Sequence, residues 1–224
     1  LLQEAGAPHP RCTMIIETCE ESGSFDLPPY LEALSERLGN PDMVVVLDSG
    51  GPDYDHIWMT EALRGLVSGT LSVKVSHEGI HSGNSGGSIP SSFRIQRILL
   101  DRVEDSSSGK VRIPEMHVEI PEKVRENAIS LKDIVGDSIW EQFPTVDTLR
   151  QASETTEDMI LAMNWEPTLS IIGADGIPSV QDAGNVLRTN TDLKLSFRIP
   201  PGVDSEYATA RAKEILEKDP PYGA

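Results

Sequence analysis

The sequence has few cysteines, few aromatic residues and few basic residues. Cys12 and Cys19 are the two cysteines among 224 residues; their spacing assigns no disulfide and matches no zinc motif, which is typical of a reduced, cytoplasmic protein. Lysine and arginine number 19 against 36 acidic residues, and the formal net charge of −17 argues against nucleic acids and anionic membranes as partners. No apolar run approaches the length of a membrane span and no signal peptide is recognisable, so we expect a cytoplasmic localisation.

Two short apolar runs near the start of the sequence have the pattern of buried parallel strands. They cover residues 12–16 and 43–47. Between them, residues 28–38 carry leucines at 31, 34 and 38, a spacing that predicts one apolar helix face. The sequence therefore predicts a β-α-β unit at this place, which is part of an α/β fold.

Acidic residues follow both predicted strands. Glu20 and Glu21 come soon after the first strand, and Asp48 ends the second, directly before turn residues. The carboxyl ends of parallel strands are where open α/β sheets build their sites, and adjacent carboxylates can divide the work of binding a metal and moving a proton. The alternatives are a solvated Glu-Glu surface pair and an Asp48 that only caps a turn.

A glycine-rich and serine-rich segment, residues 78–90, contains His81. Its glycines permit tight turns and close approach to a ligand, so that His81 can stabilise a developing oxyanion or carry a proton. A lone histidine in such a loop can equally be an ordinary surface residue. The segment has neither the P-loop pattern nor G-x-G-x-x-G, which excludes a phosphate-binding loop of either kind.

Apolar and polar residues alternate over residues 67–75 and again over 193–199, as in a sheet with one face on a core. Arg198 falls on the polar face of the second segment, where it can meet a ligand or form a surface salt bridge. Two amphipathic helices can cover the apolar face. Their apolar positions are Ile95, Ile98, Leu99 and Val103 in one helix and Ala208, Ala212, Ile215 and Leu216 in the other, which Asp204 begins as N-cap. The order strand, helix, strand, strand, helix predicts an α+β layer with an antiparallel sheet and helices on one face.

Three segments, in this order, resemble one family. Residues 16–24 (Ile-Glu-Thr-Cys-Glu-Glu-Ser-Gly-Ser), residues 46–48 (Val-Leu-Asp) and residues 81–87 (His-Ser-Gly-Asn-Ser-Gly-Gly) are similar to the di-zinc peptidases. This family includes carnosine dipeptidases, aminoacylases, succinyl-diaminopimelate desuccinylases and glutamate carboxypeptidases. The resemblance is strongest to the carnosine (cytosolic non-specific) dipeptidase branch. Residues 165–171 and 195–201 of this sequence also resemble the lid domain of that branch.

The resemblance implies a metal-dependent hydrolase. Glu20 would be the general base that activates a metal-bound water, Glu21 would bind one zinc ion and Asp48 the other. The implied cofactors are two divalent metal ions, zinc by family, although carboxylates also accept manganese and cobalt. The family's remaining ligands, a His-x-Asp motif and a late histidine, have no counterpart here: His9 has no aspartate two residues on, and His117 has the wrong context. The sequence is therefore expected to be an internal fragment that is inactive alone.

The resemblance also implies substrate contacts and a partner. His81 would reach into the active site of the partner subunit and stabilise the tetrahedral intermediate. Asn185 and Arg198 would contact the substrate, with Arg198 holding its carboxylate through a bidentate pair that lysine cannot match. A homodimer formed through the lid domain is expected, because an exposed sheet edge needs a partner or protection.

These expectations define domains and a function. Residues 1–63 would be a partial catalytic domain, and residues 64–224 a lid and dimerisation domain with an insert around 104–164 that has no assigned chemistry. The expected reaction is hydrolysis of a peptide or amide bond in a dipeptide or related small substrate with a free carboxylate. Two alternatives remain open: an N-acyl amino acid deacylase of the same family, and a non-catalytic dimerisation module derived from it.

Overall fold

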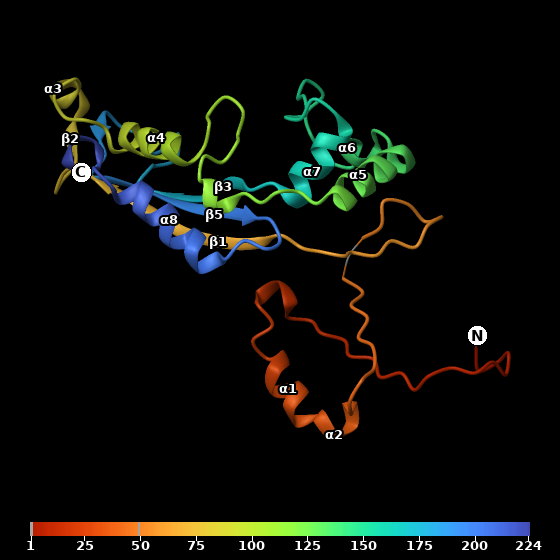
Figure 1. Cartoon of the computed structure of the whole chain (residues 1–224). Coiled ribbons are helices and arrows are strands. Elements are labelled where there is room, and N and C mark those ends of the chain that lie inside the picture. The colour runs from red at the N-terminus through yellow and green to blue at the C-terminus, as the bar shows by residue number, and fades with distance from the viewer. Residues whose placement is uncertain (1, 49) are drawn as a thin grey trace. The chain divides into compact units, whose positions relative to one another are not determined.

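The computed structural model describes residues 2–48 and 50–224, which fall into two compact units, Leu1–Gly50 and Gly51–Ala224 (Figure 1). The predicted domain boundary after residue 63 stays a prediction. Within the described residues, none of the helices combines the length and the apolar character needed to span a membrane.

The first unit contains three short helical segments: the 3-10 helix η1 (Glu20–Ser22), α1 (Leu27–Ala33) and α2 (Ser35–Leu38). Proline in the first turn of α1 suits its start, because proline fixes a helical φ and lacks only an N–H that has no partner there. The helix predicted over residues 28–38 is therefore present, although Leu34 interrupts it.

The two parallel strands predicted in this unit are not formed. Residues 12–16 and 43–47 belong to no strand, and their large apolar side chains are exposed. A parallel strand depends on ladder hydrogen bonds to neighbours on both sides and on burial of both faces. Neither segment finds such a neighbour among the described residues, so the β-α-β unit is present only in its helical part.

The second unit is built on an antiparallel sheet in the order β1-β5-β3. These strands are β1 (Gly65–Lys74), β5 (Asn190–Ile199) and β3 (Thr168–Asp175). The register of β1 and β5 runs unbroken from Gly65 opposite Ile199 to Lys74 opposite Asn190, whereas β3 carries a bulge between Ile171 and Gly173. This arrangement confirms the predicted antiparallel sheet.

Two long helices, α4 (Ser92–Val103) and α8 (Ser205–Glu217), lie on one face of this sheet (Figure 1). Asp204 begins α8 as predicted, because its Oδ1 accepts hydrogen bonds from the amides of Glu206 and Tyr207 at 2.9 and 3.0 Å. Helices and strands together bury one apolar core. Its members include Ile95, Leu99, Val103, Leu193, Leu195, Phe197, Ala208 and Ala212.

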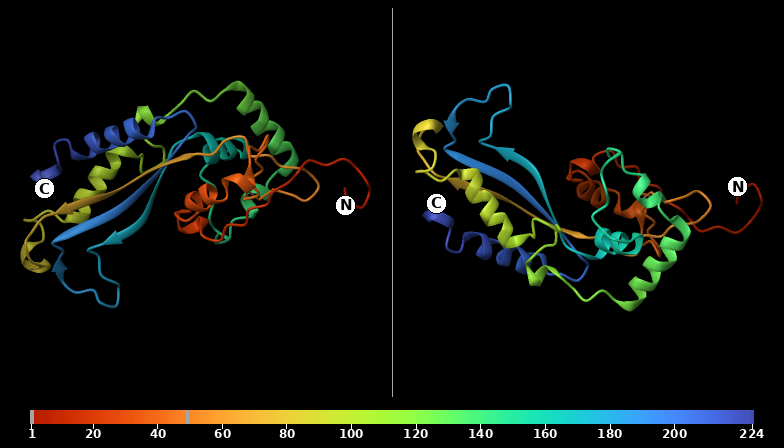
Figure 2. Two further views of the ribbon diagram at one scale, coloured as in Figure 1. Left: turned by 90° about the horizontal axis from the view of Figure 1, so that it is seen from below. Right: turned by 90° about the horizontal axis from the view of Figure 1, so that it is seen from above.

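The predicted insert forms a separate helical cluster. It consists of α5 (Glu122–Val135), α6 (Ser138–Glu141) and α7 (Thr156–Trp165), and Thr155 caps the last of these through its hydroxyl. Figure 2 shows these helices gathered at one end of the sheet, beyond the start of β1. Trp140 packs against their small core.

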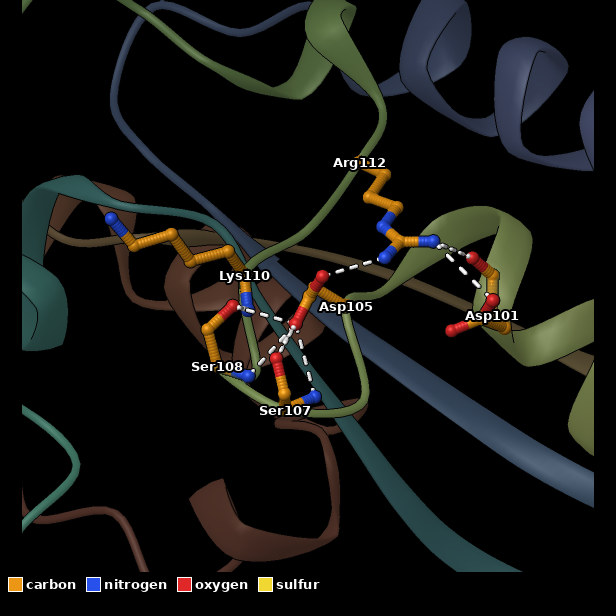
Figure 3. Close-up of polar contacts among 6 residues, drawn as sticks. All are labelled: Asp101, Asp105, Ser107, Ser108, Lys110 and Arg112. Atoms are coloured by element: carbon orange, nitrogen blue, oxygen red, sulfur yellow. Dashed lines mark hydrogen bonds and ion pairs between the residues drawn. The ribbon is translucent and has the colours of Figure 1, made fainter.

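A polar loop joins α4 to the short 3-10 helix η2 (Pro114–Met116) (Figure 3). In it, one oxygen of Asp105 accepts hydrogen bonds from the amides and hydroxyls of Ser107 and Ser108. The other oxygen pairs with Arg112 at 2.6 Å, and Arg112 also contacts Asp101. The last small helix, η3, covers Pro221–Gly223.

Candidate functional site

The paired glutamates lie in a tight turn of the first unit. Glu20 and Glu21 open η1, and Gly23 ends it in a left-handed conformation with φ of 100°, donating its amide to the Glu20 carbonyl at 2.8 Å. Only glycine adopts this conformation without strain, which explains its place after the two acids. Both carboxylates are exposed, as is Asp48.

The acids do not assemble a metal centre from the described residues. No group of three or more histidine, cysteine, aspartate or glutamate side chains is placed there to hold an ion. Both cysteines are free thiols, and burial together with the hydrogen bond to Glu17 raises the pKa of the Cys19 thiol. The donor set among the described residues is therefore a small number of exposed carboxylates, which is too few for a complete zinc site.

His81 lies at the end of β2 (Ile80–His81), directly before the one-turn helix α3 (Ser82–Ser85). Its ring Nδ1 accepts a hydrogen bond from the Gly83 amide at 3.2 Å, which places the proton of the neutral ring on Nε2. A Cβ on Gly83 would come within 3.1 Å of that nitrogen, so glycine here allows the ring to lie against the backbone. The exposed imidazole thus presents an N–H donor at a fixed position.

Asn185 is brought next to His81. The strand β4 (Val186–Leu187) pairs with β2, placing Val186 opposite His81, and the Asn185 carbonyl accepts from the Ser82 amide at 2.9 Å. Two of the predicted site residues, both exposed, therefore share one small structure at the end of the sheet where β1 stops and β5 starts. In Figure 1 this structure is marked by the labels β2 and α3.

Arg198 lies near the opposite end of β5. It is exposed, as its predicted place on the polar face requires, and it stands between Leu66 of β1 and Thr168 of β3 in the ladder. Arg198 lies eight positions beyond Asn190 in β5, which at about 3.3 Å per residue is roughly 26 Å of strand. Arg198 therefore cannot share one dipeptide with His81 and Asn185 of the same chain.

A second arginine at this end of the sheet was not predicted from the sequence. Arg64, directly before β1, donates through Nη1 to the Thr168 hydroxyl at 3.1 Å and to two backbone carbonyls near the end of α7. Its partners lie about a hundred residues further along the chain, so no local pattern marks it. The one available signal is an arginine immediately before an amphipathic strand, which by itself is weak.

Comparison with known proteins gives a consistent set of relatives. The chain is 24% identical over 205 residues to a Beta-Ala-His dipeptidase of Mus musculus, and 26% identical over 195 residues to the Cys-Gly metallodipeptidase DUG1 of Saccharomyces cerevisiae. These matches cover 91% and 87% of this chain but 41% and 40% of the relatives. The chain thus spans about two fifths of the length of the curated relatives it matches. No protein-family model matches it.

Solved structures show the same likeness in fold. The dipeptidase Dug1p of Saccharomyces cerevisiae superposes with a TM-score of 0.65 at 24% identity, covering 89% of this chain and 42% of that one. The M20 family metallo-carboxypeptidase Sso-CP2 of Sulfolobus solfataricus gives 0.61 at 20% identity, covering 88% and 50%. The resemblance predicted from the three sequence motifs is confirmed: the homologues of this chain are Beta-Ala-His and Cys-Gly dipeptidases.

Proposed function

We propose that this chain forms part of a metal-dependent dipeptidase that acts as a homodimer. Its homologues are dipeptidases, which supports the reaction class. The observation that carries the dimeric site is the distance along β5 between the His81–Asn185 structure and Arg198. Because these groups cannot meet on one small substrate within a chain, two copies must each contribute one of them.

Each group has a definite chemical role in this proposal. The planar Arg198 guanidinium holds the terminal carboxylate of the dipeptide through two parallel hydrogen bonds. His81 of the partner subunit donates its Nε2–H to the oxygen of the scissile carbonyl, on which negative charge develops as water attacks. Asn185 lies beside His81 and adds a second polar contact from the same subunit.

In this proposal the acids of the first unit have roles that rest on the family resemblance. Glu20 would take the proton of the attacking water, and Glu21 and Asp48 would each give one carboxylate to a metal ion, zinc by family resemblance. Divalent ions of this kind lower the pKa of water and polarise carbonyls. Since the described residues do not form a complete metal site, the remaining ligands would come from other parts of the complete enzyme.

The proposal is tested by making hybrid dimers of the complete enzyme. His81→Ala and Arg198→Gln each damage both sites of a homodimer, so each variant alone should have little dipeptidase activity. In a mixed dimer one site keeps both Arg198 and the partner's His81. Random exchange of equal amounts should therefore restore about a quarter of the wild-type activity, because half the dimers carry one intact site of two.

The same experiment can also contradict the proposal. If mixing and subunit exchange restore no activity, the two residues act within one chain and the shared site is wrong. Mixing two preparations of His81→Ala is the matched control and should restore nothing. Assays with dipeptides beside N-acetyl amino acids identify the substrate class, because both present the free carboxylate that Arg198 would hold.

A further inference from the structure

Arg64 is anchored on one side of its guanidinium group. Nη1 donates to the Ala162 carbonyl at 3.4 Å, to the Glu166 carbonyl at 3.3 Å and to the Thr168 hydroxyl at 3.1 Å. Ala162 lies in the last turn of α7 and Glu166 is its C-cap, so the positive charge stands where the helix dipole favours it. No hydrogen bond of Nε or Nη2 is found among the residues that the structure describes.

The ladder places this guanidinium beside Arg198. Leu66 and Thr168 both pair with Arg198, one on each side of β5, and directly opposite residues point to the same face of a sheet. Arg64 precedes Leu66 by two residues and so continues the same face. Its bond to Thr168 therefore crosses β5 on the face that carries Arg198.

The two arginines have no acidic partner in the described part of the chain. Neither forms an ion pair with a carboxylate there, although acidic residues outnumber basic ones almost two to one in the sequence. Burial, and then the positive charge of Arg198, lower the pKa of the Arg64 guanidinium. Two adjacent cations without a counter-ion repel each other, and an anion bound between them would remove that repulsion.

We propose that Arg64 is a specificity-determining residue that, with Arg198, forms a two-arginine site for the terminal carboxylate of the substrate. This inference rests on the proposed function, in which Arg198 holds that carboxylate. Arg198 is on an exposed strand face and binds the carboxylate directly. The three acceptors that hold Nη1 fix the Arg64 guanidinium, so its charge and its remaining donors are already in place when the anion arrives, at little cost in conformational entropy.

The test compares a dipeptide with its C-terminal amide in the complete enzyme. Arg64→Gln should raise KM for the dipeptide about tenfold or more, as expected for a lost charged interaction, and leave KM for the amide and kcat for both nearly unchanged. Arg64→Lys should recover part of the loss, because it keeps the charge without the fixed fork. Equal losses with the two substrates would overturn the inference and assign Arg64 a purely structural role.

Arg102 provides a matched control. It too donates to backbone carbonyls at a helix end, those of Ile215 in the last turn of α8 and of Lys218 and Asp219 after it, but it lies on α4 on the other face of the sheet. Arg102→Gln should lower stability to a similar extent without changing the preference for the dipeptide over its amide. A similar change of preference in Arg102→Gln would also count against a specific role of Arg64.

A binding measurement separates this inference from the proposed function. With the chain labelled with nitrogen-15, N-acetylglycine should shift the guanidinium resonances of Arg64 and Arg198, and N-acetylglycinamide should not. If this shift occurs but the complete enzyme hydrolyses no dipeptide, the proposed function is wrong and the anion site stands. If dipeptides are hydrolysed and only the Arg198 resonance shifts, the dipeptidase stands and the role of Arg64 is wrong.

Discussion

At the scale of single residues, the carboxylate of Asp105 organises the loop after α4. Hydrogen bonds from the Ser107 hydroxyl, the Arg112 guanidinium and the backbone amides of Ser108 and Ser107 hold the pKa of Asp105 well below its usual value. Five donors thus converge on the Asp105 carboxylate, and these hydrogen bonds hold the loop of residues 105–112 in a defined conformation. Such a group stabilises the folded state only while it is ionised.

This carboxylate gives a prediction about pH. Its folded-state pKa is depressed, so its contribution is complete above the unfolded value of about 4 and is lost as the pH falls further towards the folded value. Asp105→Asn should lower the thermal unfolding midpoint at pH 7, and the difference from the wild type should shrink below about pH 4. Thermal unfolding followed by circular dichroism between pH 2 and pH 7 measures this difference.

Asp101→Asn is the control for this prediction. Asp101 contacts the same arginine at 3.4 Å but is more exposed and receives none of the serine hydrogen bonds. Its replacement should have a smaller effect at neutral pH. A difference between Asp105→Asn and the wild type that stays constant down to pH 2 would show that the ionised form contributes nothing special.

At the scale of elements, Gln96 connects a helix to the sheet beneath it. The side chain is fully buried in α4, and its Nε2 donates to the Leu71 carbonyl of β1 and to the Thr191 carbonyl of β5, both at 2.7 Å. Beside it, the Ser92 and Thr191 hydroxyls share a buried hydrogen bond of 2.6 Å. The helix is therefore held by polar contacts at fixed positions as well as by its apolar face.

Removing this connection should destabilise the second unit. Gln96→Leu keeps a similar volume but leaves two carbonyls without their side-chain donor, which should lower the free energy of unfolding by about 1–3 kcal/mol. Chemical denaturation followed by circular dichroism measures the loss. Arg97→Leu, at the next position on the exposed side of α4, should change stability by less than about 0.5 kcal/mol. Equal effects of the two substitutions would contradict the argument.

The elements also show how far the sequence determines the structure. The helices α4 and α8 and the strands β1 and β5 were predictable because each carries its own periodic apolar face. Residues 12–16 and 43–47 are equally apolar, yet they form no strand, because a parallel strand exists only through neighbours that local sequence does not specify. His81 and Arg198 were predicted as site residues through motifs, whereas Arg64 acquires its place from partners in α7 and β3.

At the scale of the whole molecule, the sheet has two open edges. In the order β1-β5-β3, the outer strands pair on one side only within the part of the chain that the structure describes. An edge strand presents unpaired backbone groups and is a natural place for a second chain to add. The edge of β3 also exposes two large apolar side chains, Ile171 at 50% and Ile172 at 63%. We therefore expect the homodimer of the proposed function to form along β3.

A substitution at Ile172 tests whether the dimer forms along β3 without damage to the fold. Ile172 is the extra residue of the bulge and has no partner on β5, so Ile172→Lys leaves the ladder within the chain intact. A charge at this place should shift the dimer towards monomer, which native mass spectrometry at several protein concentrations detects. Ser72→Lys, on the β1 edge, should leave the dimer unchanged. The reverse pattern would assign the interface to β1, and unchanged dimers in both variants would exclude either edge. Because the proposed shared site needs two copies, loss of the dimer through Ile172→Lys should also abolish dipeptidase activity although every proposed catalytic residue is retained.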